Sequence, residues 1–285
     1  MPARPTAIPL LFIFATVTAQ PTFSQNTGVY GGSGGTSYVI RCTPYEILVG
    51  IGVNAGLWID RISLWCAEPG SVMTGGYDVS GAATLSAGKA HFGTSEKRAG
   101  CGGSPNAVKG LRLTAGQYVN TIALKCAKLG RSWRTDYTMT DVAPIGGVPG
   151  PNAATRTCGG QMVAVGIHGR AGEYVDAIGL LCGYVLPSKP VPQGPINGLN
   201  VTTKRPTFYW SGGQHDLGKN TICLNTVASA DCAAPGTVKA EIEYNLSSWT
   251  PTEDLPFQRG TRVYWSINAC NDNGCRSGVG YFSAH

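Results

Sequence analysis

The chain has 285 residues, of which 40 are glycine and only 13% are charged. Helices prefer Ala, Leu, Glu and Lys, so this composition argues against a helical protein and favours β-sheet with many tight turns. The net charge of +6 comes from scattered basic residues, without a basic run or an RNA-binding signature, so nucleic acid is not an expected partner.

Residues 1–24 have the pattern of a secretory signal peptide. Arg4 supplies the positive charge, residues 7–19 form the apolar core, and Val17 and Ala19 suit a cleavage site. This core is too short to span a bilayer, and no later stretch is long and apolar enough for a membrane span. The ten cysteines agree with export, so we predict a secreted, extracellular protein, or a periplasmic one in a bacterium.

One unit recurs three times between residues 29 and 186, and its copies end at Cys66, Cys126 and Cys182. Aligning these cysteines brings the same residue types into register. The aligned positions are Gly56, Gly116 and Gly172; Asp60, Asn120 and Asp176; Ile62, Ile122 and Ile178; and Leu64, Leu124 and Leu180. Self-similarity at a nearly constant period dictates architecture, and three copies favour a closed, pseudo-threefold object.

Each copy is predicted to be a β-hairpin. In the first, Val49, Ile51 and Val53 alternate with small or polar residues, which predicts one buried and one exposed face. The turn is expected at residues 54–56, because glycine accepts a positive φ. Facing residues of a hairpin have a constant sum of numbers, and the midpoint of each cysteine pair lies close to a turn. We therefore expect three disulfides across the hairpins, each worth roughly 3 kcal/mol: Cys42–Cys66, Cys101–Cys126 and Cys158–Cys182.

The rest of the chain has a different character. Four prolines within residues 187–196 predict a stiff linker. Residues 197–285 hold short apolar segments at regular spacing, which predicts a small β-sandwich of the fibronectin type III or immunoglobulin-like kind. The run Gly260–Gly274 resembles the late-strand signature of fibronectin type III modules. Cys223–Cys232 and Cys270–Cys275 are the remaining expected pairs, and this domain is expected to act as a spacer or to bind a protein partner.

The third copy contains HGRAGEYVDAIGLL, residues 168–181, and resembles the final repeat of jacalin-like lectins. The glycine-rich opening at residues 30–35 strengthens the resemblance, which extends over residues 29–186. It implies the β-prism I fold, in which three four-stranded sheets surround a pseudo-threefold axis. The predicted fold class is therefore all-β: a three-fold pseudo-symmetric β-prism in residues 29–186, followed by a small β-sandwich.

In jacalin-like lectins the sugar lies between a Gly-Gly loop and a loop of pattern G-x-x-x-D. The resemblance implies a first carbohydrate-binding site made by Gly31, Gly32, Gly172, Glu173, Tyr174 and Asp176. It also implies a second candidate site made by Gly56, Trp58, Asp60, Gly75 and Gly76. In the middle copy Asn120 takes the place of the carboxylate, and an amide is a weaker acceptor.

The chemistry of sugars suits these residue types. An ionised Asp accepts hydrogen bonds from two adjacent hydroxyls, and a glycine backbone approaches a ligand closely because no Cβ intervenes. The aromatic residue shared by the copies (Trp58, Tyr118, Tyr174) packs either on the apolar face of a pyranose or into the core between sheets. Asp and Asn also suit purely structural turns.

The sequence thus predicts a secreted, lectin-like carbohydrate-binding protein whose partners are glycans or glycoconjugates. The alternative is a structural or adhesive extracellular protein on the same scaffold without sugar binding. Vitelline membrane outer layer proteins share the prism fold, carry cysteines that close their repeats, and have such a role. An enzyme, a metal or another cofactor is not expected, because the four histidines lack ligand spacing and the paired Glu241 and Glu243 suit the solvent face of a strand.

Overall fold

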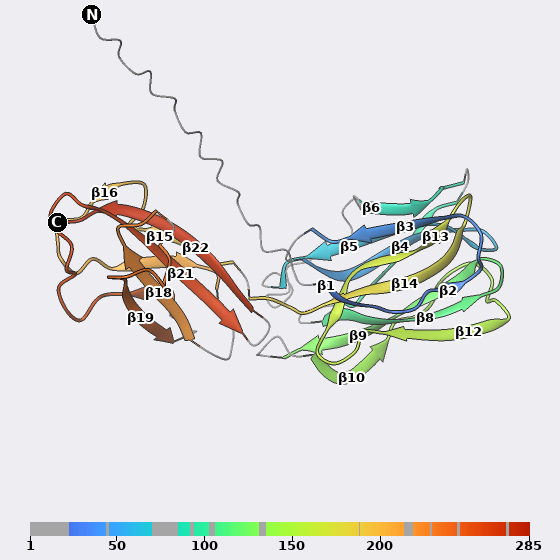
Figure 1. The fold of residues 1–285 in the computed structure, drawn as a ribbon. Helices are drawn as coiled ribbons and strands as arrows, with labels where there is room; N and C mark the ends of the chain where they lie inside the picture. The colour runs from blue at the N-terminus through green and yellow to red at the C-terminus, as the bar shows by residue number, and fades with distance from the viewer. Residues whose placement is uncertain are drawn as a thin grey trace, which may run out of the picture.

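The structure is a computed structural model, and regular structure in its described residues is almost entirely β-strand. It describes residues 23–43, 46–69, 85–91, 94–102, 106–130, 135–187, 189–213, 219–228, 230–243, 246–271 and 274–285. Figure 1 shows the strands gathered in two lobes, with β1–β14 in the first and β15–β22 in the second. The predicted signal segment lies almost wholly outside the described residues.

The first lobe consists of three antiparallel sheets, each built around one long hairpin of the repeat. Sheet A has the order β1 (Phe23–Asn26), β14 (Val175–Gly183), β13 (Val163–Ala171), β3 (Thr36–Arg41), and β2 (Tyr30–Gly31) also pairs with β14. Sheet B has the order β6 (Leu85–Gly88), β5 (Ile59–Ala67), β4 (Ile47–Ala55), β7 (Glu96–Gly100). Sheet C has the order β10 (Thr135–Asp141), β9 (Val119–Leu129), β8 (Asn106–Ala115), β12 (Asn152–Thr157), and β11 (Ile145–Gly146) also pairs with β9.

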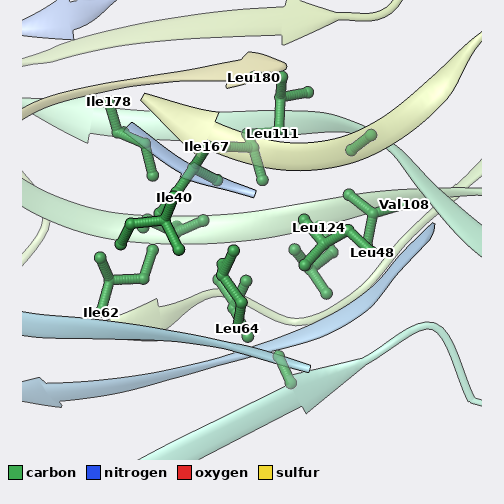
Figure 2. Close-up of a cluster of buried hydrophobic side chains, with 14 of the residues drawn as sticks. Ile40, Leu48, Ile62, Leu64, Val108, Leu111, Leu124, Ile167, Ile178 and Leu180 are labelled. Atoms are coloured by element: carbon green, nitrogen blue, oxygen red, sulfur yellow. The ribbon is translucent and has the colours of Figure 1, made fainter. Parts of the chain in front are cut away.

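The three hairpins share one apolar core. The aligned Ile62, Ile122 and Ile178 are fully buried in it, as are Leu124 and Leu180. Figure 2 shows such side chains from different sheets pointing toward one another. Burying a side chain of this size contributes about 1.5–3 kcal/mol, so the common core is the main apolar stabilisation of the lobe.

The predicted alternation in the first hairpin is wrong in two respects: β4 is buried on both faces, and Val49 does not share a face with Ile51 and Val53. Ile51 and Val53 belong to the central core together with Leu48, whereas Val49 belongs to a second buried cluster with Ile47. The cause is a β-bulge between Leu48 and Gly50, because an extra residue in one strand reverses the side-chain alternation beyond it. Equivalent register shifts occur in β8 and β13, so the bulge is repeated with the hairpin.

The predicted cysteine partners of the first lobe are confirmed, but the predicted placement is wrong. The pairs Cys42–Cys66, Cys101–Cys126 and Cys158–Cys182 are disulfides with Cα–Cα distances of 5.6, 5.5 and 5.5 Å. The first cysteine of each pair lies just beyond an outer strand of one sheet, and the second lies in the hairpin of another. The disulfides therefore join sheet A to B, B to C and C to A rather than the two strands of one hairpin.

The second lobe has two sheets around a separate core. One has the order β15 (Val191–Gly194), β17 (Phe208–Ser211), β20 (Ser248–Trp249). The other has the order β16 (Leu199–Asn200), β22 (Gly274–Ser283), β21 (Arg262–Asn271), β18 (Lys219–Asn225), β19 (Val238–Glu243). Phe208 packs edge-on against Trp265 at 5.1 Å between ring centroids, which joins the two sheets.

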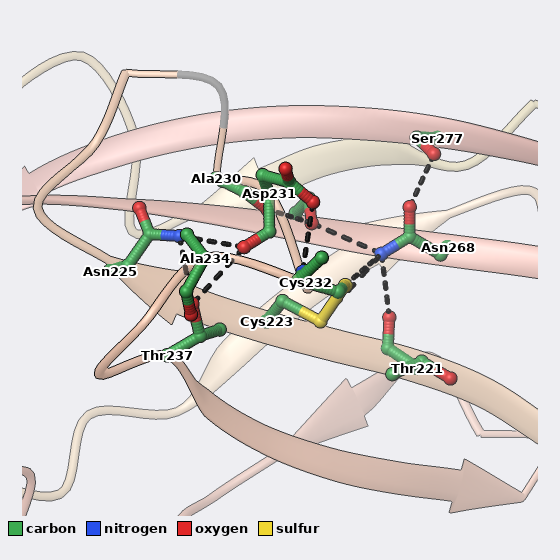
Figure 3. Close-up of a disulfide and its surroundings, with 12 residues drawn as sticks. Thr221, Cys223, Asn225, Ala230, Asp231, Cys232, Ala234, Thr237, Asn268 and Ser277 are labelled. Atoms are coloured by element: carbon green, nitrogen blue, oxygen red, sulfur yellow. Dashed lines mark hydrogen bonds between the residues drawn. A yellow bond between two sulfur atoms is a disulfide. The ribbon is translucent and has the colours of Figure 1, made fainter.

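Two disulfides belong to this lobe, Cys223–Cys232 and Cys270–Cys275, as predicted. The first is shown in Figure 3, where the Asn268 side-chain nitrogen lies 3.1 Å from the Cys232 sulfur. The second joins facing residues of β21 and β22. Part of the predicted linker also belongs to the lobe, because Val191–Gly194 forms β15 and pairs with β17.

One matched pair of substitutions measures the contribution of the central core. Val53 is 0% exposed on β4, and Val39 is 59% exposed on β3. We expect Val53→Ala to lower the free energy of unfolding by about 2–3 kcal/mol, because it leaves a cavity, and Val39→Ala to change it by less than about 0.5 kcal/mol. Denaturant unfolding measures both, and equal effects would contradict the shared core.

Candidate functional site

Three tight turns lie at one end of the first lobe, and each is followed by an acid or its amide. The turns are closed by hydrogen bonds from the Gly56, Gly116 and Gly172 amides to the carbonyl oxygens two residues on, at 3.1, 3.0 and 2.9 Å. Asp60, Asn120 and Asp176 then begin the returning strands β5, β9 and β14. The disulfides lie toward the other ends of these strands, so the turn end is free of them.

A loop covers each of these three residues. The amides of Gly32, Lys89 and Gly147 donate to the backbone carbonyl oxygens of Asp176, Asp60 and Asn120 at 2.8, 3.1 and 2.8 Å. The loops are residues 31–35 in sheet A, 88–91 in sheet B and 146–150 in sheet C. In sheet B the sequence predicted Gly75 and Gly76 at this place; they lie outside the described residues, and Gly88 and Lys89 hold the position.

Each loop also contacts the turn of a neighbouring sheet. A Cβ on Gly32 would overlap the Gln117 carbonyl, and one on Gly147 would overlap the Leu57 carbonyl. In sheet B the equivalent residue is Lys89, whose ammonium forms an ion pair with Glu173. The contacts run from A to C, C to B and B to A, so the loops and turns form a closed ring.

The first predicted site is assembled around Asp176. Its carboxylate lies against Gly34 and Gly35, since a Cβ on either would overlap its oxygens. Gly35 has φ +60°, a conformation that glycine adopts without strain. Gly31 and Gly32 instead approach the backbone of Asp176, so Gly34 and Gly35 are the glycines beside the carboxyl group. The site predicted from the sequence named Gly31 and Gly32 of this loop and did not include Gly34 and Gly35.

Two opposing effects act on the pKa of Asp176, namely burial of its carboxyl and the hydrogen-bond donors and charge near it. The residue is 4% exposed, and this desolvation raises the pKa of its carboxyl. Hydrogen bonds from the backbone amides of Asp176 and Gly172, and the charge of Arg170, act in the opposite direction. Burial disfavours the charged form and donors favour it, and the effect of burial is the larger of the two.

Glu173 and Tyr174 are part of the same turn, but their side chains are engaged elsewhere. The exposed Glu173 carboxylate pairs with Lys89 and lies 3.6 Å from His91 Nε2. The hydrogen bond from Lys89 is the main cause of the lowered pKa of Glu173. Lys89 and His91 belong to the loop of sheet B, and no pattern in the sequence indicated that they would reach this turn.

Asp60 is the most enclosed acid of the turn end. It is 2% exposed, and its Oδ1 lies 3.2 Å from His91 Nδ1. Among the residues that the structure describes, its Oδ2 has no hydrogen-bond partner. A buried carboxylate oxygen without a donor is costly, so this oxygen is an open acceptor beneath the sheet B loop.

In sheet C the polar groups are occupied within the protein. The Gly150 amide donates to Thr114 Oγ1 at 3.0 Å, and this hydroxyl is 2.7 Å from Thr121 Oγ1. Gly150 lies against the Asn120 amide oxygen as Gly34 lies against Asp176. The backbone design is shared, but the carboxylate is absent.

The three aromatic residues of the turns pack on one another. Ring centroids are 5.1 Å apart for Trp58 and Tyr118, 5.2 Å for Trp58 and Tyr174, and 4.8 Å for Tyr118 and Tyr174. His91 adds a further ring contact to Tyr174 at 5.1 Å. Of the two roles considered from the sequence, this arrangement favours packing between the sheets over stacking on a sugar.

The described part of the chain holds no group of three or more His, Cys, Asp or Glu side chains able to bind a metal ion. Nor does any helix in it have the length and apolarity that crossing a bilayer requires.

The solved structures to which the chain is similar include several lectins. No family model and no curated protein matches the chain. Among solved structures, Malaysian banana lectin is 17% identical with a TM-score of 0.39, over 56% of this chain and 98% of the lectin. Artocarpin in complex with mannotriose is 15% identical with a TM-score of 0.41, over 58% and 99%. A mannose-specific jacalin-related lectin from Morus nigra, in complex with mannose, is 16% identical with a TM-score of 0.40, over 59% and 97%.

Close approach at Gly32 can be tested by adding one methyl group. Gly32→Ala would drive Cβ into the Gln117 carbonyl, so we expect a loss of about 1–3 kcal/mol in the free energy of unfolding. Gly172→Ala is the control, because its Cβ would meet Gly35 Cα at an ordinary 3.6 Å. Thermal unfolding followed by circular dichroism measures both. Equal stability of the two variants would show that the loop is not in close contact with the neighbouring turn at Gly32.

Proposed function

We propose that the first lobe is a secreted, lectin-like carbohydrate-binding module with the pseudo-threefold prism architecture, and that Asp176 is its principal sugar acceptor. The observation that carries this proposal is the Asp176 carboxylate between two glycine backbones, Gly34–Gly35 on one side and Gly172 on the other. The resemblance of residues 168–181 and 30–35 to jacalin-like lectins supports the same assignment. The proposed site also includes Gly31 and Gly32 of the loop, and Glu173 and Tyr174 of the turn.

The chemistry follows from the arrangement. Ionised Asp176 would accept hydrogen bonds from two neighbouring hydroxyls of a pyranose, and glycine at positions 34 and 35 lets the loop backbone lie against the carboxylate where a side chain would overlap it. A site with one carboxylate is expected to give weak affinity, on the order of millimolar or about 4 kcal/mol. Useful avidity then requires several sites on one molecule or on an assembly.

Asp60 is proposed as a second, weaker site. Its unpartnered Oδ2 needs a donor, which a sugar hydroxyl supplies. His91 already contacts its Oδ1, so a ligand must share or displace this imidazole. Asn120 offers no charged acceptor, and its surroundings are already paired, so no site is proposed in sheet C.

The second lobe is proposed to be a fibronectin type III-like module that spaces the first lobe or binds a protein partner. Its interior is a complete apolar core, so it needs no contribution from the first lobe to bury Phe208, Trp265 or Phe282. Glu241 and Glu243 lie on its exposed edge strand, where Glu241 pairs with Lys219 at 2.7 Å. Exposed, paired carboxylates of this kind suit solubility rather than catalysis.

A structural role without sugar binding is the second candidate. It is favoured by the mutual packing of Trp58, Tyr118 and Tyr174, which uses the aromatic rings that could have stacked on a ligand. The ring of disulfides would equally suit a durable extracellular coat. The two candidates differ in one respect only, namely whether the folded protein recognises any glycan.

A glycan array separates the two functions. We expect the wild-type protein to bind mannose-containing or other simple glycans, Asp176→Ala to lose at least about tenfold of its signal through loss of charge-assisted bonds, and Asp60→Ala to lose less. Asp141→Ala is the control, because Asp141 is an exposed acid on β10 paired with Lys125. A folded wild-type protein that binds no glycan would favour the structural role.

Sugar binding through Asp176 should depend on pH. Burial raises the pKa of this carboxyl, so it takes up a proton at a higher pH than an exposed aspartate does. We expect full affinity at neutral pH and a decline as pH falls through the raised pKa, because protonation removes an acceptor. The effect on stability has the opposite sign, since the folded state holds this proton more tightly and loses that stabilisation as pH rises.

Titration of the wild-type protein with mannotriose by NMR between pH 8 and 4 measures this dependence. The same titration of Asp176→Asn is the control, since an amide does not ionise in this range. An affinity of the wild-type protein that stays constant down to pH 4 would rule out Asp176 as the ionised acceptor.

A further inference from the structure

A polar side chain holds the same position in each hairpin, two residues before the turn glycine, and each one bonds to the loop of its own sheet or, in sheet B, to a residue shortly after that loop. Asn54 Nδ2 donates to the Thr94 carbonyl at 3.1 Å. Thr114 Oγ1 accepts from the Gly150 amide at 3.0 Å. Arg170 bonds to Gly34 and Gly35. The same place in the fold therefore fixes each loop, with a different chemical group in each sheet.

Arg170 makes the strongest of these contacts. Its Nε donates to the Gly34 carbonyl at 2.7 Å and its Nη2 donates to the Gly35 carbonyl at 2.6 Å. Two parallel bonds from a planar guanidinium fix both position and orientation, which an ammonium cannot do. Besides the backbone bonds, one further side-chain contact ties the end of this loop, from Thr36 Oγ1 to the Ala171 carbonyl at 3.3 Å.

The loop that Arg170 holds is unusually costly to order. Residues 31–35 read Gly-Gly-Ser-Gly-Gly. Glycine loses more conformational freedom than any other residue when its backbone is fixed. If a loop of this composition were free, each binding event would carry the entropic cost of ordering it. A loop that is already held in place does not add this cost to binding.

We propose that Arg170 is a positioning residue for the carbohydrate site, and that its guanidinium fixes Gly34 and Gly35 beside Asp176 before a ligand arrives. The inference rests on the proposed sugar site at Asp176, and it adds an account of how the glycine loop beside that site is held in a fixed conformation. Loosening this loop by the freedom of about one residue's backbone should weaken sugar binding about tenfold, since fixing one residue's backbone has a cost of this order.

Arg170 also acts on Asp176 through its charge, which favours the ionised carboxylate. Tyr38 on β3 donates its hydroxyl to the Ala177 carbonyl at 3.3 Å, and its pKa is raised by burial, so it stays neutral. Glu173, in the same turn as Asp176, is paired with Lys89 and lies near His91. The two effects of Arg170 can be separated. Arg170→Lys keeps the charge but loses the pair of bonds that the planar guanidinium donates. Arg170→Met loses both the charge and these bonds at a similar side-chain length.

The test combines hydrogen exchange of the full chain without ligand and NMR titration with mannotriose. We expect faster exchange across residues 31–36 and about tenfold weaker binding in both Arg170 variants. In Arg170→Met alone, the decline of affinity should begin at a higher pH than in the wild-type protein. Asn54→Ala is the matched control, because it removes the same position from sheet B, and it should leave residues 31–36 and binding at Asp176 unchanged.

Three results would overturn the proposal. The first is unchanged exchange of residues 31–36 in Arg170→Met, whatever the protein binds. The second is unchanged or tighter binding of mannotriose by a variant whose loop has been loosened. The third is a wild-type protein that binds no glycan although Arg170 governs exchange of the loop; in that case the proposed function fails, and Arg170 is only a structural clamp.

Discussion

The three disulfides of the first lobe form a covalent circuit around one apolar core, and the rest of the lobe depends on this closure. Each joins the end of an outer strand in one sheet to the hairpin of another: A to B, B to C and C to A. Each closes a loop of about 25 residues, which the chain-entropy model values at roughly 3 kcal/mol. Because the sheets are held together at that end, their opposite ends can carry buried polar groups and glycine-rich loops.

The turn end shows how one backbone design supports three chemistries. All three sheets use a loop amide that donates to the carbonyl of the residue aligned with Asp176. Sheet A adds a carboxylate and a guanidinium, sheet B adds a carboxylate covered by a histidine, and sheet C adds an amide and a threonine. Since hydrogen bonding by the backbone does not depend on the side chain, the copies can diverge in chemistry while keeping their geometry.

Much of the fold was predictable because repetition gives redundant information. Three aligned copies fixed the hairpins, the turns and the partners of six cysteines, and regular spacing predicted the strands of the second lobe. The sheet in which each cysteine lies was not predictable. A pair such as Cys42 and Cys66 is centred on a turn whether it spans one hairpin or joins two sheets, and the bulge at Leu48–Gly50 is invisible to a pattern of alternation.

At the candidate site, the sequence pointed to Asp176 and to Gly31 and Gly32, but not to Gly34 and Gly35, which lie against the carboxyl group. Gly31 and Gly34 are alike in sequence, and only the fold decides which of them meets the carboxyl group. Lys89 and His91 were missed because they reach Glu173 from another sheet. Arg170 did leave a signal, since Asn54, Thr114 and Arg170 each precede Ala-Gly, and a polar residue aligned across three hairpins indicates a shared task.

The direction of β14 has a consequence for how the molecule would be used. This strand starts at the turn that carries Asp176 and finishes at Gly183, a few residues before β15 enters the second lobe. The second lobe therefore emerges from the end of the first lobe opposite its loops. A chain immobilised through its C-terminus on a cell or matrix would hold those loops outermost, facing whatever surface approaches.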